Sequence, residues 1–294
     1  MIDMLERNLV TLLLIGLVLG GTIFLIVFLK DYILSIKNEK IEKEGSILSF
    51  SLIGSFVCFI DTLGIGGFAP MTALFKEFKL VKDRVIPGTL NTAMCIPIIV
   101  EALIFIKEVK VDSLTLVSML VAATLGAVIG AGVVSKWNEK KIQAGMALAL
   151  TGVVVIMLAG KIGVLSEGGK EIGLTGIKLS VAIVGNFILG ALMTLGIGLY
   201  APCMALVYAL GLSPLAAFPI MMGSCAFLMP FASIKFMKEN AYNKKATLII
   251  TITGVIGVVI AAYVVKALPL NILSWLIIIV IAYTAIKLFM DSKK

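Results

Sequence analysis

The chain contains no histidine and few charged residues, since only 14% of its 294 residues are Asp, Glu, Lys or Arg. Without histidine it lacks the commonest metal ligand of proteins and the side chain that usually relays protons near neutral pH. Its four cysteines (58, 95, 203 and 225) stand in apolar segments without a C-x-x-C spacing. We interpret them as small buried side chains, and we expect neither a cofactor nor a metal.

Apolar residues take the place of the missing charge. They make up 60% of the chain, the mean hydropathy is +1.13, and several runs reach the roughly 20 residues that cross a bilayer. The sequence therefore predicts an all-α, multi-pass integral membrane protein. The net charge of +8 arises largely from lysines in short loops, a pattern that orients helices in a membrane. No aromatic-interleaved basic surface indicates nucleic-acid binding.

One motif occurs twice inside these apolar runs. The stretch D-T-L-G-I-G-G-F-A-P at 61–70 matches M-T-L-G-I-G-L-Y-A-P at 193–202 in seven of ten positions. The distance in sequence between the two copies, from position 61 to position 193, is called the repeat offset. A glycine cluster followed by proline cannot continue an α-helix. In lipid, opened backbone is tolerated only where it is buried in protein or lines a wet cavity. We therefore predict two interrupted helices that face one shared pocket, the substrate site.

The apolar runs also repeat in order. The run 46–78 has 33 residues and would reach about 50 Å as one helix, against a hydrocarbon core of about 30 Å. We predict an extra N-terminal helix with a charged connector (1–45), a first transmembrane repeat (46–160), a linker (161–176) and a second repeat (177–294). Each repeat holds one interrupted helix pair and three further helices, and all the uninterrupted spans are expected at 9–29, 84–106, 114–134, 142–160, 215–236, 246–265 and 270–289.

Two topologies stay open for the interrupted pairs, which either return to one side as re-entrant hairpins or cross the membrane. With re-entrant pairs and the amino terminus outside, 18 of the 25 Lys and Arg residues lie on the cytoplasmic side, and full crossing gives 16. The positive-inside rule favours re-entry slightly. Re-entry would also leave three crossings in each repeat and make the repeats inverted, as in many secondary transporters.

The interruptions carry the predicted binding groups. A helix that restarts after glycines presents backbone N–H groups without intrahelical partners, at the positive end of its dipole, which suits an anion. The alternative is that the glycines only let helices touch or kink. Residues of the next helix in each repeat are further candidates, with helix-to-helix hydrogen bonding as an equal alternative. The predicted substrate-binding residues are Thr62, Gly64, Gly66, Gly67, Asn91, Thr92, Thr194, Gly196, Gly198 and Ser224.

Two acidic residues, Asp61 and Glu101, are expected at membrane depth. An intramembrane carboxylate is a functional hypothesis, either as a proton carrier or as a cation ligand. Asp61 could instead cap the restarting helix, and Glu101, six residues before Lys107, could instead reach the interface. Neither has an acidic equivalent at the repeat offset, where Met193 and Ser233 stand, so any coupling would be asymmetric.

At these residues the chain resembles the sulfite exporter TauE/SafE family, also called toluene sulfonate uptake permeases. The similarity rests on the G-I-G-G loop with Pro70, its second copy with Pro202, and a four-segment unit that occurs twice within about residues 46–289. The resemblance implies a permease of the cytoplasmic membrane for small anions such as sulfite or sulfonates. The family's loop usually continues with another glycine, whereas this chain has Phe68 in one copy and Leu199 and Tyr200 in the other.

The sequence thus predicts a secondary transporter of a small anion that works by alternating access, with a proton or cation as a coupling partner. The alternative is a channel-like or cation-coupled transporter of another solute, in which opened carbonyl groups face the ion. An enzyme is not expected, because H-E-x-x-H and G-x-S-x-G patterns are absent and there is no histidine base. A homo-oligomer is compatible with the sequence.

Overall fold

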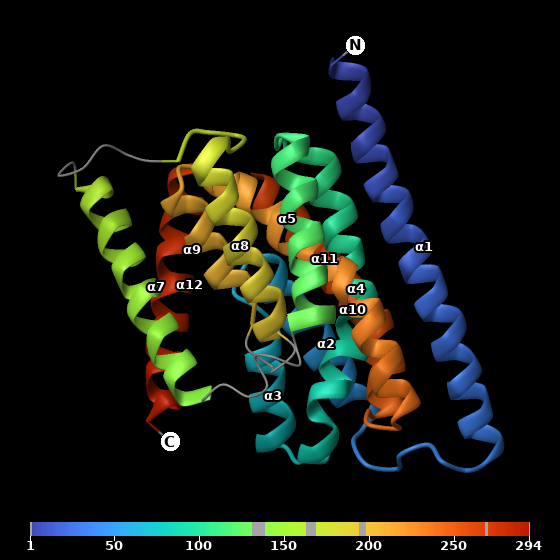
Figure 1. The fold of residues 1–294 in the computed structure, drawn as a ribbon. Helices are drawn as coiled ribbons and strands as arrows, with labels where there is room; N and C mark the ends of the chain where they lie inside the picture. Colours follow the sequence, from blue (N-terminus) through green and yellow to red (C-terminus); the bar gives the residue numbers. More distant parts are fainter. Residues whose placement is uncertain (1, 131–138, 163–168, 194–197, 268–269, 294) are drawn as a thin grey trace. The chain divides into compact units, whose positions relative to one another are not determined.

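The computed structural model describes residues 2–130, 139–162, 169–193, 198–267 and 270–293. All named elements of these residues are helices, which confirms the predicted all-α class (Figure 1). In chain order they are α1 (Ile2–Lys37), α2 (Ile47–Thr62), α3 (Phe68–Glu77), η1 (Asp83–Val85), α4 (Ile86–Glu108), α5 (Ser113–Leu125), η2 (Gly126–Gly130), α7 (Glu139–Lys161), α8 (Gly176–Met193), α9 (Tyr200–Ala209), η3 (Pro214–Ala216), α10 (Ala217–Lys238), α11 (Lys244–Ala267) and α12 (Leu270–Ser292).

Seven helices of the described residues are long and apolar enough to cross a membrane, which supports a multi-pass membrane protein. They lie in α1, α4, α7, α8, α10, α11 and α12. The span expected at 114–134 is present as the shorter apolar helix Ser113–Ile129, whose last residues form the π-helical turn η2.

The two predicted helix interruptions are confirmed. In the first, α2 ends at Thr62 and α3 begins at Phe68; in the second, α8 ends at Met193 and α9 begins at Tyr200. With 16 and 10 residues, α2 and α3 are about 24 Å and 15 Å long. Each is therefore shorter than the roughly 30 Å hydrocarbon core, and only the two together have the length to cross it.

The helices of the second half repeat those of the first at nearly constant spacing. Shifting α3 by the repeat offset gives 200–209, the bounds of α9, and shifting α7 gives 271–293, one residue from α12. The bounds of α2 and α4 fall within three residues of those of α8 and α10 after the same shift, and the first residue of α5 falls within one residue of that of α11. Helix α1 stands outside this repeat. The domain boundaries given above concern repeats along the sequence and stay a prediction.

The described residues form two compact units, each of which takes helices from both halves of the chain. The first unit contains residues 1–107 and 225–266, and the second contains 108–224 and 267–294. The interrupted pair α2–α3 thus belongs with α4 and α11, while the pair α8–α9 belongs with α5, α7 and α12. Since α11 and α5 are equivalent in the repeat, each interrupted pair packs with a helix from the other half of the chain.

Glycines make these two exchanged contacts close. A Cβ atom built on Gly257 of α11 would lie 2.1 Å from the carbonyl oxygen of Ser55 on α2. In the second unit, a Cβ on Gly126 would lie 1.9 Å from the carbonyl oxygen of Phe187 on α8. Ser55 and Phe187 are related by the repeat offset, so the same backbone contact recurs in both units. Small residues that let helix backbones touch are typical of membrane helix packing.

Helix α1 is attached to the first unit by small residues and by polar contacts. A Cβ on its Gly21 would come within 3.2 Å of Ile99 of α4. The Tyr242 hydroxyl donates to Asp31 of α1, and Glu42 of the connector accepts from the backbone N–H of Lys244 at the start of α11 at 3.0 Å. Burial and the hydrogen bond to Asp31 raise the pKa of Tyr242, so this hydroxyl remains a donor at ordinary pH.

Gly257→Ala should destabilise the first unit. Overpacking against a neighbouring backbone costs about 1–3 kcal/mol, and thermal unfolding of the purified protein in detergent measures the loss. Gly152→Ala on α7 is the control, because that glycine is exposed with nothing within 4 Å of an added Cβ. The control should gain up to about 1 kcal/mol of helix propensity. Equal unfolding temperatures for the two variants would contradict the close α2–α11 contact.

Candidate functional site

The loop between α2 and α3 closes the carboxyl end of α2 with its own backbone. Gly64 has φ +92°, the left-handed conformation that glycine adopts most easily. Its N–H donates to the carbonyl of Asp61 at 2.8 Å, and the N–H of Ile65 donates to the carbonyl of Ile60 at 3.3 Å. This pair of bonds is a Schellman motif. Two of the last carbonyl groups of α2 are therefore satisfied within the chain and are not offered to a ligand.

The amino end of α3 is held by a side chain of α2. The N–H of Gly67, the N-cap of α3, donates to Oδ1 of Asp61. A carboxylate here also interacts favourably with the positive end of the helix dipole. The capping role considered for Asp61 is thus observed. Gly67 is tightly packed, since a Cβ on it would lie 2.4 Å from Met94. The neighbouring Gly66 instead has φ +83° and open space around its Cβ position.

A second carboxyl group lies beside the first. Asp61 and Glu101 are 2% and 0% exposed, and their carboxyl groups are neighbours. The other oxygen of Asp61, Oδ2, is buried and has no hydrogen-bond partner among the described residues. A buried polar atom without a partner is costly, and in a native structure it marks a place where a proton, ion or water is expected.

The hydrogen bonds of the Thr62 hydroxyl indicate a proton on the neighbouring Glu101 carboxyl group. The Thr62 hydroxyl lies 2.9 Å from Oε1 of Glu101 and 2.8 Å from the carbonyl oxygen of Cys58. A hydroxyl has one hydrogen to donate, but both of these neighbours are acceptors unless Glu101 is protonated. A proton on Glu101 lets that carboxyl donate to Thr62 while Thr62 donates to Cys58, which satisfies both contacts. The arrangement thus accommodates a protonated carboxyl group.

Two other predicted residues of the first unit make bonds between or within helices. The hydroxyls of Thr92 on α4 and Thr247 on α11 lie 2.8 Å apart. The Asn91 amide donates to the carbonyl of Pro87 at 2.9 Å, and its backbone carbonyl accepts from Ser233 at 3.0 Å. These contacts agree with the alternative of helix-to-helix hydrogen bonding. A binding role for both residues stays a prediction.

The second unit contains an asparagine that the sequence analysis missed. Asn186 on α8 is fully buried, and its amide donates to Ser224 Oγ at 2.9 Å and to the carbonyl of Met119 at 2.7 Å. Its Oδ1 has no partner among the described residues. The predicted residue Ser224 is therefore part of a buried polar pair. A lone amide in an otherwise apolar helix was the signal available in the sequence.

The second interruption has no acid where the first has Asp61. Its equivalent is Met193, the last residue of α8. Gly198 is exposed, with nothing within 4 Å of an added Cβ, and it precedes α9 by two residues. The predicted residues Thr194 and Gly196 lie outside the described residues. The two loops belong to different units, and the prediction that they face one pocket stays a prediction.

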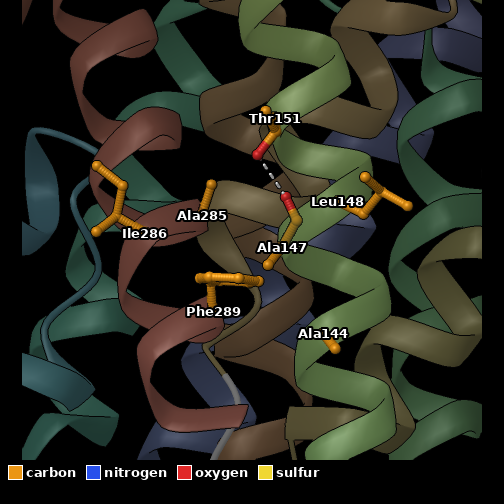
Figure 2. A pocket seen from close by; sticks show the side chains of 7 residues that line it. All are labelled: Ala144, Ala147, Leu148, Thr151, Ala285, Ile286 and Phe289. Atoms are coloured by element: carbon orange, nitrogen blue, oxygen red, sulfur yellow. Dashed lines mark hydrogen bonds between the residues drawn. The ribbon is translucent and has the colours of Figure 1, made fainter. Parts of the chain in front are cut away.

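A groove elsewhere in the second unit does not suit an anion. About 470 Å³ in volume, it lies between α7 and α12 (Figure 2). Its one hydroxyl, that of Thr151, already donates to the carbonyl of Ala147 at 2.8 Å. The rest of its lining is apolar: Ala144, Ala147, Leu148, Ala285, Ile286 and Phe289. With no charged side chain and no available hydrogen-bond donor, the lining of this groove suits hydrocarbon chains and not an anion.

The candidate site is therefore the first interruption with its carboxyl pair. Among the described residues, no group of three or more His, Cys, Asp or Glu side chains could hold a metal ion. Comparisons of the chain with protein-family models, curated proteins and solved structures find no match.

Thr62→Val should destabilise the protein by about 1–3 kcal/mol, the typical cost of leaving a buried polar partner unsatisfied. Thr72→Val on α3 is the matched control, because Thr72 also bonds the carbonyl four residues back, at 2.7 Å, but bonds no carboxyl group among the described residues. Chemical unfolding in detergent compares the two. Equal losses would show that the contact between Thr62 and Glu101 contributes nothing.

Proposed function

We propose that this protein is a secondary transporter of a small anion, of the sulfite or sulfonate kind, in the cytoplasmic membrane. The observation that carries the proposal is the interruption between α2 and α3, which leaves a helix amino terminus beside glycines in the middle of an apolar segment. The first N–H groups of such a helix have no intrahelical partner. Opened backbone of this kind is tolerated in lipid when it lines a cavity.

The polarity of the interruption favours an anion over a cation. The carbonyl groups of Ile60 and Asp61 are bonded within the Schellman motif, whereas α3 points its positive end into the loop. Glycine at 64, 66 and 67 allows a ligand to approach this backbone closely. At the second interruption, Gly198 provides open space next to the start of α9 without a carboxylate at the equivalent of Asp61.

The repeat supports alternating access as the mechanism. Apart from α1 and the turn η2, the named helices of the first half begin within three residues of their equivalents in the second half after the repeat offset. Secondary transporters commonly consist of two repeats whose broken helices meet at the substrate. In this proposal the repeats are inverted, and each interruption presents the amino end of a helix to an anion. The proposed polar lining is Thr62, Asn91 and Thr92 in the first unit and Ser224 in the second. The resemblance to the sulfite exporter family supplies the substrate class.

A cation-coupled or channel-like transporter is the second candidate, and one observation favours it. Asp61 and Glu101 place two carboxyl groups side by side at full burial, and intramembrane acids mark ion or proton pathways. In the main proposal these acids carry the coupled proton or cation. Flux that saturates and is inhibited by competing anions would favour the transporter of anions, and cation flux without an anion would favour the alternative.

Gly198→Leu should strongly reduce transport while leaving the fold intact. Its side chain would occupy the open space at the start of α9, where an anion approaches the backbone. Uptake of labelled sulfite or methanesulfonate into proteoliposomes should fall by about tenfold or more, a loss of about 1.4 kcal/mol or more in anion binding. Gly66→Leu should act likewise at the first interruption, with added strain from its positive φ.

Gly145→Leu on α7 is the control for both variants, because this glycine is exposed and has open space around it. It should transport like the unmodified protein. If Gly198→Leu is monodisperse in gel filtration and transports normally, the second interruption is not part of the anion site. If the unmodified protein transports no small anion in either direction, the proposed function is wrong.

A further inference from the structure

We propose that Asp61 is a built-in competitor of the transported anion, displaced from the start of α3 when the Asp61–Glu101 pair takes up a proton. The inference rests on the proposed function and names its coupling ion and its regulation. The N–H of Gly67 is bonded to Oδ1 of Asp61. A transported oxyanion that uses the amino end of α3 needs this same donor.

Two observations beyond the helix terminus support a ligand here. Oδ2 of Asp61 is buried without a hydrogen-bond partner among the described residues, so one oxygen of the capping group is available to bind a proton. The backbone next to it is open, because nothing lies within 4 Å of a Cβ built on Gly66. The loop therefore has room for an incoming group beside Gly66, the residue before the capped Gly67.

Because both are negatively charged, the Asp61 carboxylate and the transported anion cannot occupy the start of α3 together. An anion at the start of α3 would lie close to the buried Asp61 carboxylate, and like charges close to a buried group repel strongly. The titratable groups that face Asp61 are Glu101 from α4 and Cys58 from its own helix. Among the described ion pairs, none provides Asp61 with a lysine or arginine to offset this repulsion. A proton is then the means of removing the negative charge.

The proton balance is simple. One proton binds Oδ2 of the Asp61 carboxylate and gives a neutral carboxyl group, whose O–H can donate to Glu101. The neutral group is a weaker acceptor for the Gly67 N–H, and the anion takes that donor. Release of the anion reverses the step, and the proton leaves Asp61. Because Met193 stands at the equivalent position of the second repeat, the exchange occurs at one interruption only, with one proton for each anion.

Reciprocal linkage sets the direction of the effect. If anion binding and protonation favour each other, the anion affinity rises as the pH falls, by up to about tenfold per pH unit for one linked proton. A sulfonate such as methanesulfonate is the suitable probe, because it keeps its single charge over the whole range. Sulfite is less suitable because it titrates near neutral pH.

The test is methanesulfonate binding to the purified full chain, measured by calorimetry from about pH 5.5 to about pH 8. The unmodified protein should bind more tightly at the lower pH and take up about one proton per anion in weakly buffered solution. Asp61→Asn retains an oxygen for Gly67 but carries no charge, so its affinity should be high and independent of pH.

The outcomes separate the two proposals. If the unmodified protein binds no sulfonate at any pH, the proposed anion site is wrong. Binding with equal affinity at all pH values, or without proton uptake, leaves the anion site in place and overturns the competition by Asp61. The proton-uptake measurement needs no variant, so the inference remains testable if Asp61→Asn fails to fold. Binding by Asp61→Asn that keeps the pH dependence of the unmodified protein would also overturn the inference.

Discussion

The hydrogen bond from the Gly67 N–H to Asp61 joins the two parts of the interrupted helix, and the rest of the site depends on it. Helix α3 has ten residues, and an isolated helix of that length is marginal. Its first turn contains Pro70, which suits this place because the first N–H groups of a helix have no intrahelical partner, and the carboxylate from α2 further stabilises this end. The cap also places a carboxyl group deep in an apolar segment, where Glu101 lies beside it.

The interruption has two chemically different ends. The end of α2 is closed by its own backbone through the left-handed Gly64, while the start of α3 is closed by a side chain that can change its charge. Only the second closure can respond to a proton. The glycine contact of α11 with α2 holds the neighbouring helix of the same unit in place, so a charge change at Asp61 occurs beside closely packed helices.

Much of the fold could be predicted from the sequence, because apolar runs and glycine–proline breaks have direct physical consequences in lipid. Both interruptions, the all-helical class and most of the spans follow from them. The exchange of α5 and α11 between the two halves could not be predicted, since a repeat in sequence does not determine which copies pack together. In the site, Asp61 and Glu101 were predicted at membrane depth. That Asp61 caps α3 could not be predicted, because it depends on where the folded loop places the N–H of Gly67. Asn186 was missed because a single buried amide has no pattern around it.

The most direct measurement is the water accessibility of the first interruption. Ala69, half-buried in the first turn of α3, can be replaced by cysteine and exposed to a membrane-impermeant maleimide, which reacts only with thiols in water. The four native cysteines are buried and should give little background, and Phe56→Cys, on the exposed side of α2, serves as the lipid-facing comparison. An anion site at the interruption predicts that Ala69→Cys is labelled, that methanesulfonate slows the labelling, and that Phe56→Cys is not labelled. Labelling of Ala69→Cys no faster than that of Phe56→Cys would contradict a wet cavity at this interruption.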